Sequence, residues 1–166
     1  MNPVIPPLNK AVVHAQIMAM LEQIHCNAQS ATQTAIDAAT SEETVAEHKY
    51  DTFSLEASYL AHGQAMRVQQ CAQDIVSYQG MVLRDFDQDS PIALGALVTL
   101  EDQASQLHHY FIGPAAGGIE LAGPPKVTVI TPQSPLAQAM LGLKLDDEVR
   151  WQRGEQWLLM DVVAIC

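Results

Sequence analysis

The first part of the chain shows the hydrophobic pattern of a long amphipathic helix. Between residues 9 and 39, apolar side chains recur at steps of four and three, which is the spacing of a heptad coiled coil. These positions are Val13, Ile17, Met20 and Ile24, and the same spacing continues through Asn27, Ala31, Thr34 and Ala38. Asn9, which follows Pro6 and Pro7, is well placed to cap this helix.

A second stretch, residues 53–78, repeats small and apolar residues at the same steps. They are Ala57, Ala61, Ala65, Val68, Ala72 and Ile75. In both stretches the small side chains lie toward residues 40–52 and the large ones at the far ends, so we expect an antiparallel hairpin that reaches on the order of 40 Å. Gly63 costs its helix about 1 kcal/mol relative to Ala, which favours close approach of the partner helix or another chain.

From residue 80 the pattern changes to short strands and turns. Strands are predicted within 92–100, 110–112, 127–130, 148–151 and 157–165, and the Gly- and Pro-rich residues 113–125 are predicted to be a loop. Ser134 as N-cap and Pro135 at the first helical position start a short helix that ends at Gly142. The predicted fold class is α+β. An antiparallel helical coiled-coil hairpin occupies residues 1–79, and an α+β domain with an antiparallel sheet and one short helix occupies 80–166.

Composition narrows the possible functions of this chain of 166 residues. It has neither a run of ~18 apolar residues nor the pattern of a signal peptide, so we expect a cytoplasmic protein without a membrane partner. Lys and Arg number 8 against 19 Asp and Glu, and the net charge of −11 argues against specific DNA binding. The three cysteines lack a C-x-x-C pair and the histidines lack ligand spacing, so we expect no metal site and no cofactor of its own.

The negative charge of the first half is concentrated in one segment, residues 37–56. Its carboxylates are Asp37, Glu42, Glu43, Glu47, Asp51 and Glu56, and Lys49 is its one basic residue. The tip of the hairpin, about residues 40–52, is therefore predicted to be acidic. Most acidic clusters are solvated surfaces, but the position of this one at a tip favours a function. The candidate tip residues are Glu47, Asp51, Glu56, Glu42 and Glu43.

Residues 127–149, VTVITPQSPLAQAMLGLKLDDEV, resemble a known signature. It is that of the C-terminal domain of the Gre family of bacterial transcription elongation factors, in which a strand leads into a Ser-Pro helix and then an acidic turn. The matching residues are Ser134, Pro135, Leu136, Ala139, Met140, Leu141, Gly142, Asp146, Asp147 and Val149. Residues 95–100, 110–112 and 157–165 are similar to strands of that domain, and the helical hairpin is similar to the coiled coil of the family.

The resemblance implies an FKBP-like C-terminal domain that docks on RNA polymerase. The docking candidates that follow from it are Ser134, Pro135, Leu136, Asp146 and Asp147. The resemblance also implies that the coiled coil enters the secondary channel of the polymerase and carries the acidic tip toward the active centre. In the cleavage factors of the family, two tip carboxylates help to hold a second Mg²⁺, because two metal ions stabilise both the attacking and the leaving oxygen.

The tip departs from the cleavage motif of the family. With Ala57-Ser58-Tyr59 as the counterpart of the family's Ala-(Glu/Asp)-Tyr, the two catalytic positions fall on Thr52 and Leu55, which are not carboxylates. We therefore expect a regulator of RNA polymerase that has no catalytic residues and is not an enzyme. Stimulation of transcript cleavage, with Mg²⁺ shared with the polymerase, is the less favoured outcome.

Two other functions stay open. An FKBP-like domain can bind peptides or isomerise prolyl bonds in an aromatic pocket. The aromatic residues available for one are Phe86, Tyr110, Phe111, Trp151 and Trp157, of which Phe111 and Trp157 are expected in the core. Alternatively, the hairpin mediates homodimerisation, so both a monomer and a homodimer fit the sequence.

Overall fold

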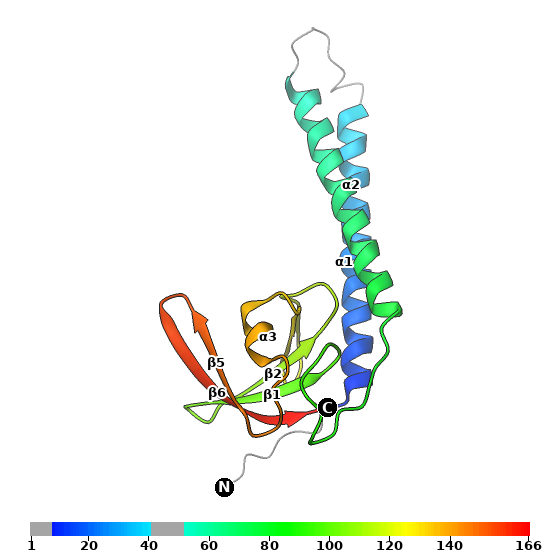
Figure 1. The fold of residues 1–166 in the computed structure, drawn as a ribbon. Helices are drawn as coiled ribbons and strands as arrows, with labels where there is room; N and C mark the ends of the chain where they lie inside the picture. Colours follow the sequence, from blue (N-terminus) through cyan, green and yellow to red (C-terminus); the bar gives the residue numbers. More distant parts are fainter. Residues whose placement is uncertain (1–7, 41–51) are drawn as a thin grey trace. The chain divides into compact units, whose positions relative to one another are not determined.

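The structure is a computed structural model that describes residues 8–40 and 52–166. Two long helices precede a six-stranded sheet that carries one short helix (Figure 1). The predicted α+β class is confirmed. Two compact units divide the chain: residues 18–76 form one, and residues 1–17 with 77–166 form the other. The predicted boundary between residues 79 and 80 stays a prediction. None of the helices among the described residues carries an apolar stretch that would span a lipid bilayer.

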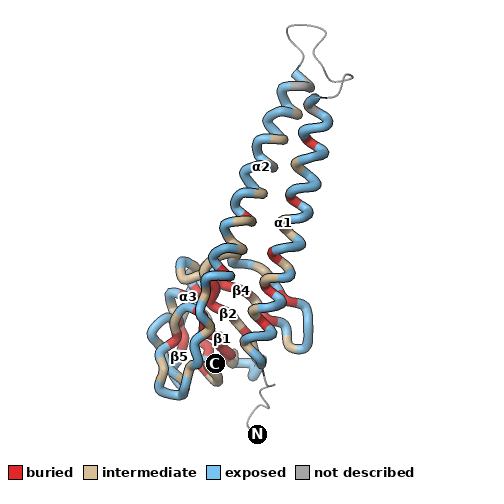
Figure 2. The backbone as a smooth tube through the Cα atoms, turned by 90° about the vertical axis from the view of Figure 1, so that its right-hand side faces the viewer, coloured by how far each residue is buried: buried red, intermediate tan, exposed pale blue. Residues whose placement is uncertain are grey.

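The two long helices are α1 (Lys10–Thr40) and α2 (Thr52–Gln79), which run antiparallel and side by side (Figures 1 and 2). α1 begins where predicted, because the side-chain oxygen of Asn9 accepts hydrogen bonds from the backbone N–H groups of Ala11 and Val12 at 3.0 and 3.3 Å. These bonds satisfy N–H groups that have no partner inside the helix. The segment that connects the helices at the predicted tip, residues 41–51, lies outside the described residues.

The buried side of α1 does not follow the predicted heptad. Its buried positions are Val13, Ile17, Leu21, Ala28 and Ala35, with Ile24 and Thr32 half-buried (Figure 2). The predicted positions Asn27, Ala31, Thr34 and Ala38 are exposed. Burial thus recurs every 11 residues, from Val13 to Ile24 to Ala35. A repeat of about 3.67 residues per turn lies close to the natural 3.6 of an α-helix, whereas a heptad requires left-handed supercoiling.

The inner side of α2, in contrast, keeps heptad steps of four and three residues from Ala57 to Tyr78. Its half-buried residues are Ala57, Ala61, Gln64, Val68, Ala72, Asp74 and Ile75, and Cys71 and Tyr78 are buried. Ala65, which the sequence pattern placed on this side, is exposed, and Gln64 takes its place. The expected close approach of the partner helix at Gly63 is also wrong, because no described atom outside its own helix lies within 4 Å of where its Cβ would stand, and approach of another chain stays a prediction. The small residue therefore accommodates neither α1 nor another described segment.

The sheet has the strand order β3-β4-β2-β1-β6-β5. The strands are β1 (Leu97–Asp102), β2 (Leu107–Ile112), β3 (Glu120–Leu121), β4 (Val127–Ile130), β5 (Glu148–Arg153) and β6 (Gln156–Ile165). All neighbours are antiparallel except β2 and β4, which are parallel. The sheet is therefore mixed rather than antiparallel throughout, and β3 lies inside the segment 113–125 that was predicted to be a loop.

Alternation of side chains gives the sheet two buried faces. One face packs against α3 (Pro135–Met140). Its core includes Val98, Leu100, Ile112, Met140, Val149 and Val162. The opposite side chains of the same strands are buried as well, among them Leu97, Phe111 and Val129. On that face the imidazole Nδ1 of His109 lies 2.9 Å from the hydroxyl of Thr99, and burial lowers the pKa of His109, which favours its neutral form.

Tyr78, in the last turn of α2, is fully buried. Its hydroxyl donates a hydrogen bond to the carbonyl oxygen of Ala115 at 2.9 Å, and its own carbonyl lies 3.0 Å from Nε2 of His14 in α1. Gly113 gives the ring its space, since a Cβ there would lie 2.0 Å from the Tyr78 hydroxyl oxygen. The first turns of α1 and the end of α2 are thus joined to the sheet through one ring.

Replacement of Gly113 by Ala is expected to destabilise the protein by about 2–4 kcal/mol, because the methyl group displaces the Tyr78 ring and breaks its hydrogen bond to Ala115. Chemical denaturation measures this change. Gly123→Ala is the matched control, because its Cβ would meet only the Pro125 carbonyl oxygen, at 3.9 Å. Equal denaturation midpoints for the two variants would contradict the role assigned to Gly113.

Candidate functional site

The start of α3 holds three of the predicted docking residues. Ser134 adopts an extended conformation with φ −69° and ψ 145°, and its hydroxyl accepts a hydrogen bond from the N–H of Ala137 at 3.2 Å. Pro135 occupies the first turn and is exposed, whereas Leu136 is only 6 % exposed and packs in the core. This segment therefore offers Pro135 and the half-buried Ser134 to a partner, while Leu136 holds the helix on the sheet.

Asp146 and Asp147 form an exposed turn between α3 and β5. The Asp147 carboxylate accepts a hydrogen bond from the N–H of Lys144 at 2.7 Å. Asp146, at φ +68°, donates its N–H to the carbonyl oxygen of Val162 at 2.9 Å, and the N–H of Val162 returns to the carbonyl oxygen of Asp147 at 2.9 Å. The two aspartates are thus fixed against β6 by a set of hydrogen bonds separate from that of Ser134.

Among the predicted tip residues, Glu56 is the one that the structure describes, and it is exposed on α2. Glu42, Glu43, Glu47 and Asp51 lie outside the described residues. Thr52 and Leu55, to which the sequence resemblance assigns the catalytic positions of the family, are described and exposed, Leu55 by 53 %. No group of three or more His, Cys, Asp or Glu side chains within residues 8–40 and 52–166 is placed to hold a metal ion.

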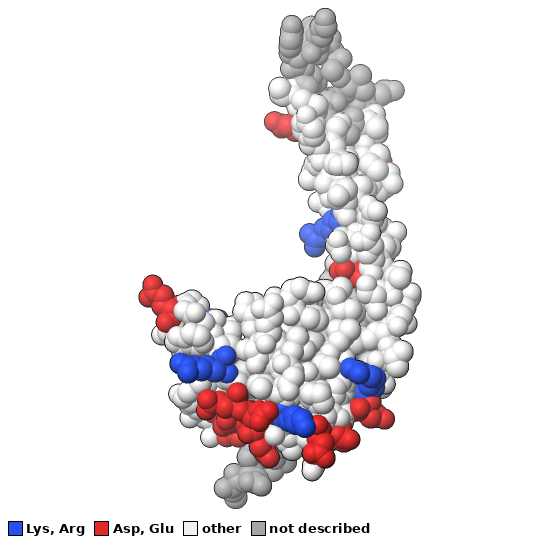
Figure 3. Space-filling view, in the orientation of Figure 1, with Lys and Arg blue, Asp and Glu red and all other residues white. Residues whose placement is uncertain are grey.

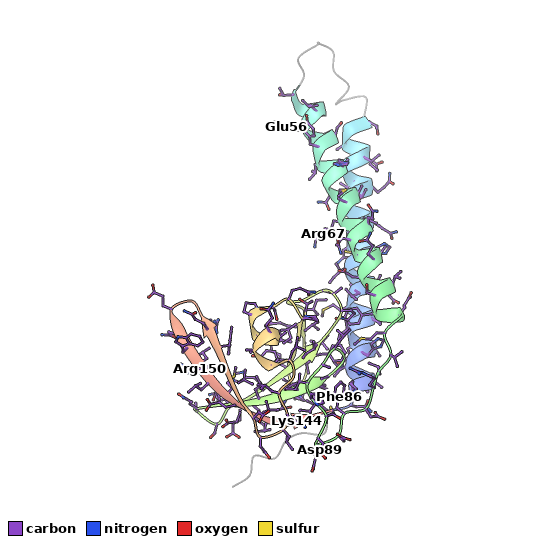
Figure 4. The ribbon with its side chains drawn as sticks, viewed as in Figure 1. Glu56, Arg67, Phe86, Asp89, Lys144 and Arg150 are labelled. Carbon is purple, nitrogen blue, oxygen red and sulfur yellow. The ribbon has the colours of Figure 1, made fainter. Side chains whose placement is uncertain are left out.

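A cavity of about 410 Å³ opens at the end of the sheet formed by β1, β2, β5 and β6. Tyr110, Trp151 and Trp157 line it together with Asp102, His108 and Arg153. The expectation that Phe111 is a core residue is confirmed, but the expectation for Trp157 is wrong, since 57 % of its surface is exposed. Instead, the guanidinium carbon of Arg150 lies 4.9 Å from the centre of the Trp157 ring, and both residues belong to the β5–β6 hairpin. Figure 4 labels Arg150 on this hairpin.

The polar groups at this cavity differ in how many hydrogen bonds they make. The Asp102 carboxylate lies 2.8 Å from Nε2 of His108 and accepts hydrogen bonds from the N–H groups of Ala104 and Gln106 at 2.9 Å each. The His108 contact and these backbone bonds hold the pKa of Asp102 below its ordinary value. In contrast, the indole N–H of Trp151 is buried without a hydrogen-bond partner among the described residues.

Sequence reasoning did not identify Asp102 and His108 as a pair. Their signal was local, because the two residues flank the tight turn between β1 and β2 and lie near each other across the ladder, in which Leu100 pairs with His108. Charged side chains near each other across an antiparallel pair commonly interact.

In Figure 3, charged side chains gather around the sheet domain, whereas the visible face of the helices shows few.

The lowered pKa of Asp102 predicts a pH dependence of stability. A carboxyl group whose pKa is lowered by folding stabilises the protein above its ordinary pKa of 3.8, and this contribution is lost as the pH falls through the lowered value. Asp102→Asn should therefore lower the Tm at neutral pH, and the difference from the parent should shrink in acid. Glu155→Gln, at the exposed β5–β6 turn, is the control. A deficit that stays constant down to about pH 2 would contradict the assignment.

The sequence of this chain matches the model of one protein family. Residues 87–165 match the family model of the C-terminal domain of the transcription elongation factors GreA and GreB. This match confirms the resemblance to the Gre family that the Ser134–Val149 signature carries. No curated protein matches this chain.

Solved structures of proteins with Gre-related names are also similar to this chain. The GreA factor homolog 1 (Gfh1) of Thermus thermophilus shows 21 % identity over 90 % of this chain and 94 % of its own, with a TM-score of 0.39. Gfh1 of Thermus aquaticus shows 24 % identity over 91 % of this chain and 92 % of its own, with a TM-score of 0.40. The GreA/GreB factor of Nitrosomonas europaea shows 15 % identity over 57 % of this chain and 78 % of its own, with a TM-score of 0.36.

Proposed function

We propose, from the GreA/GreB C-terminal domain that residues 87–165 carry, that this chain is a Gre-like factor that binds RNA polymerase and modulates elongation. The match to this domain is the observation that carries the proposal. The sheet domain supplies the docking surface, through exposed groups at the start of α3 and at the Asp146–Asp147 turn. The helical hairpin then enters the secondary channel of the polymerase.

The dimensions of the helices support a channel-entering arm. α1 has 31 residues and α2 has 28, which correspond to rods on the order of 40–45 Å. Of the sequence's net charge of −11, residues 37–56 hold a large share. An acidic tip is attracted to a channel that has cationic walls, so the association should weaken with added salt.

The residues at the cleavage positions favour modulation without transcript cleavage. Neither Thr52 nor Leu55 offers a carboxylate, and Leu55 presents an apolar side chain to solvent. Two oxygens must converge on a second Mg²⁺ for hydrolysis to be accelerated. The chain is therefore proposed to act without enzyme activity of its own, and a Mg²⁺ shared with the polymerase would have to be held by tip residues other than these two.

Binding and elongation assays with core RNA polymerase test the proposal. The chain should associate with the polymerase at low salt and change the rate of RNA extension. A variant in which a Gly-Ser linker replaces residues 41–51 should associate more weakly and lose its effect on extension. On stalled, backtracked complexes with Mg²⁺, the parent chain should leave the RNA ladder unchanged.

Variants at Ser134 separate docking from folding. Ser134→Ala removes the helix cap and is expected to destabilise the domain by about 1 kcal/mol, whereas Ser134→Asn retains a capping oxygen. If the polymerase contacts the hydroxyl itself, both variants should bind more weakly although only the Ala variant is less stable. No detectable association of the parent chain at low salt would overturn the proposed function.

Peptide binding by the sheet domain is a second candidate function. The cavity of about 410 Å³, which Tyr110, Trp151 and Trp157 line, is the observation that favours it. Trp157→Ala should abolish capture of proline-containing peptides by the full chain. If the parent chain captures no such peptide, this second function is excluded.

A further inference from the structure

α2 carries apolar side chains on two opposite sides. The inner side packs toward α1 through positions such as Ala57, Ala61 and Val68. On the other side, Leu55, Tyr59 and Met66 are exposed by 53, 69 and 57 %, and His62 between them is exposed too. Steps of four, three and four residues place these four side chains within about 60° of one another on the helix. Leu55, Tyr59, His62 and Met66 are called the outer stripe below.

The outer stripe is complementary to itself when one copy is turned end for end. Rotation about a point between Leu60 and Ala61 brings Leu55 opposite Met66 of a second copy and Tyr59 opposite His62 of that copy. Steps of four and three residues form the alternating layers by which antiparallel helices pack. The same stripe in a parallel pair would place each side chain against itself.

The charges beside the stripe fit the antiparallel arrangement. Glu56 and Arg67 are 11 residues apart, so they lie only about 20° apart around the helix, and both point to the same side of α2 (Figure 4). In the antiparallel pair each Glu56 lies on the same flank as Arg67 of the second copy and about 3 Å from it along the helix axis, which is close enough for two ion pairs. A parallel pair would instead place the charged flanks of the two copies on opposite sides of the seam, so these charges would not meet. The flank between them is open, because no described atom lies within 4 Å of a Cβ built on Gly63.

We propose that α2 pairs antiparallel with α2 of a second copy through the outer stripe, with two ion pairs between Glu56 and Arg67 beside it. The stripe spans about 16 Å of helix, which is less than a standard protein interface requires. The homodimer is therefore weak and forms only at high protein concentration. This interface is distinct from the side of α2 that faces α1, and it does not depend on the function proposed above.

Charge exchange in the full chain tests the dimer by sedimentation velocity over a wide range of concentration. The parent should shift from monomer to dimer as concentration rises. Glu56→Arg and Arg67→Glu each convert two attractive contacts into two repulsive ones, so each should weaken dimerisation by about tenfold. The combination of both substitutions restores opposite charges and should return the dimer to within about threefold of the parent.

Glu22→Arg is the matched control, because it makes the same charge change at an exposed position of α1 away from the stripe. It should leave dimerisation close to that of the parent. Circular dichroism confirms that each variant remains helical. A parent chain that stays monomeric throughout, a control that weakens the dimer as much as Glu56→Arg, or a double variant that is not rescued would each overturn the proposal.

Crosslinking in a Cys26→Ser background tests the orientation. A mixture of Tyr59→Cys and His62→Cys chains should form a disulfide between copies, because these positions face each other in the antiparallel pair within the short distance a disulfide needs. Faster crosslinking of Tyr59→Cys chains to one another than to His62→Cys chains would indicate parallel pairing and would contradict the proposed arrangement.

Discussion

The burial of Tyr78 is the contact on which the sheet domain and the helix ends that belong to it depend. A phenol ring without solvent exposure requires a partner for its hydroxyl, and the carbonyl oxygen of Ala115 provides it at 2.9 Å. The ring occupies space that Gly113 leaves free, and its backbone contacts His14 of α1. Both helix ends therefore share one anchor on the sheet. The loop that follows β2 is fixed by the same anchor.

The proposals for the helical unit and for the sheet domain draw on different surfaces. The inner side of α2 is used within the hairpin, so the outer stripe is available for a partner. If the paired hairpin is too wide for a polymerase channel, dimerisation and channel entry exclude each other, and mass action then links the two equilibria. At high concentration the dimer would withhold chains from the polymerase. On dilution, the stripe would become free for entry into the channel.

Local signals in the sequence predicted the helices, their caps and the α3 motif, because the N-cap bonds of Asn9 and Ser134 involve residues two or three positions away. The buried positions of the helical hairpin could not be predicted in the same way. Alanine-rich positions differ little in side-chain size, so a heptad and an 11-residue repeat fit the sequence almost equally well. The parallel pairing of β2 with β4 depends on segments that are distant in the sequence. The exposure of Trp157 depends on where the sheet lacks a covering layer. The acidic tip stays a prediction, because residues 41–51 lie outside the described residues.

The 11-residue repeat has a consequence for how such an arm can change in evolution. Because about three full turns of helix contain 11 residues, insertion or removal of that many residues in both helices leaves every remaining side chain on its original face. Each such step changes the reach by about 16 Å and rotates one end against the other by only about 20°. The length of the hairpin can therefore change in steps of 11 residues while its inner packing is preserved.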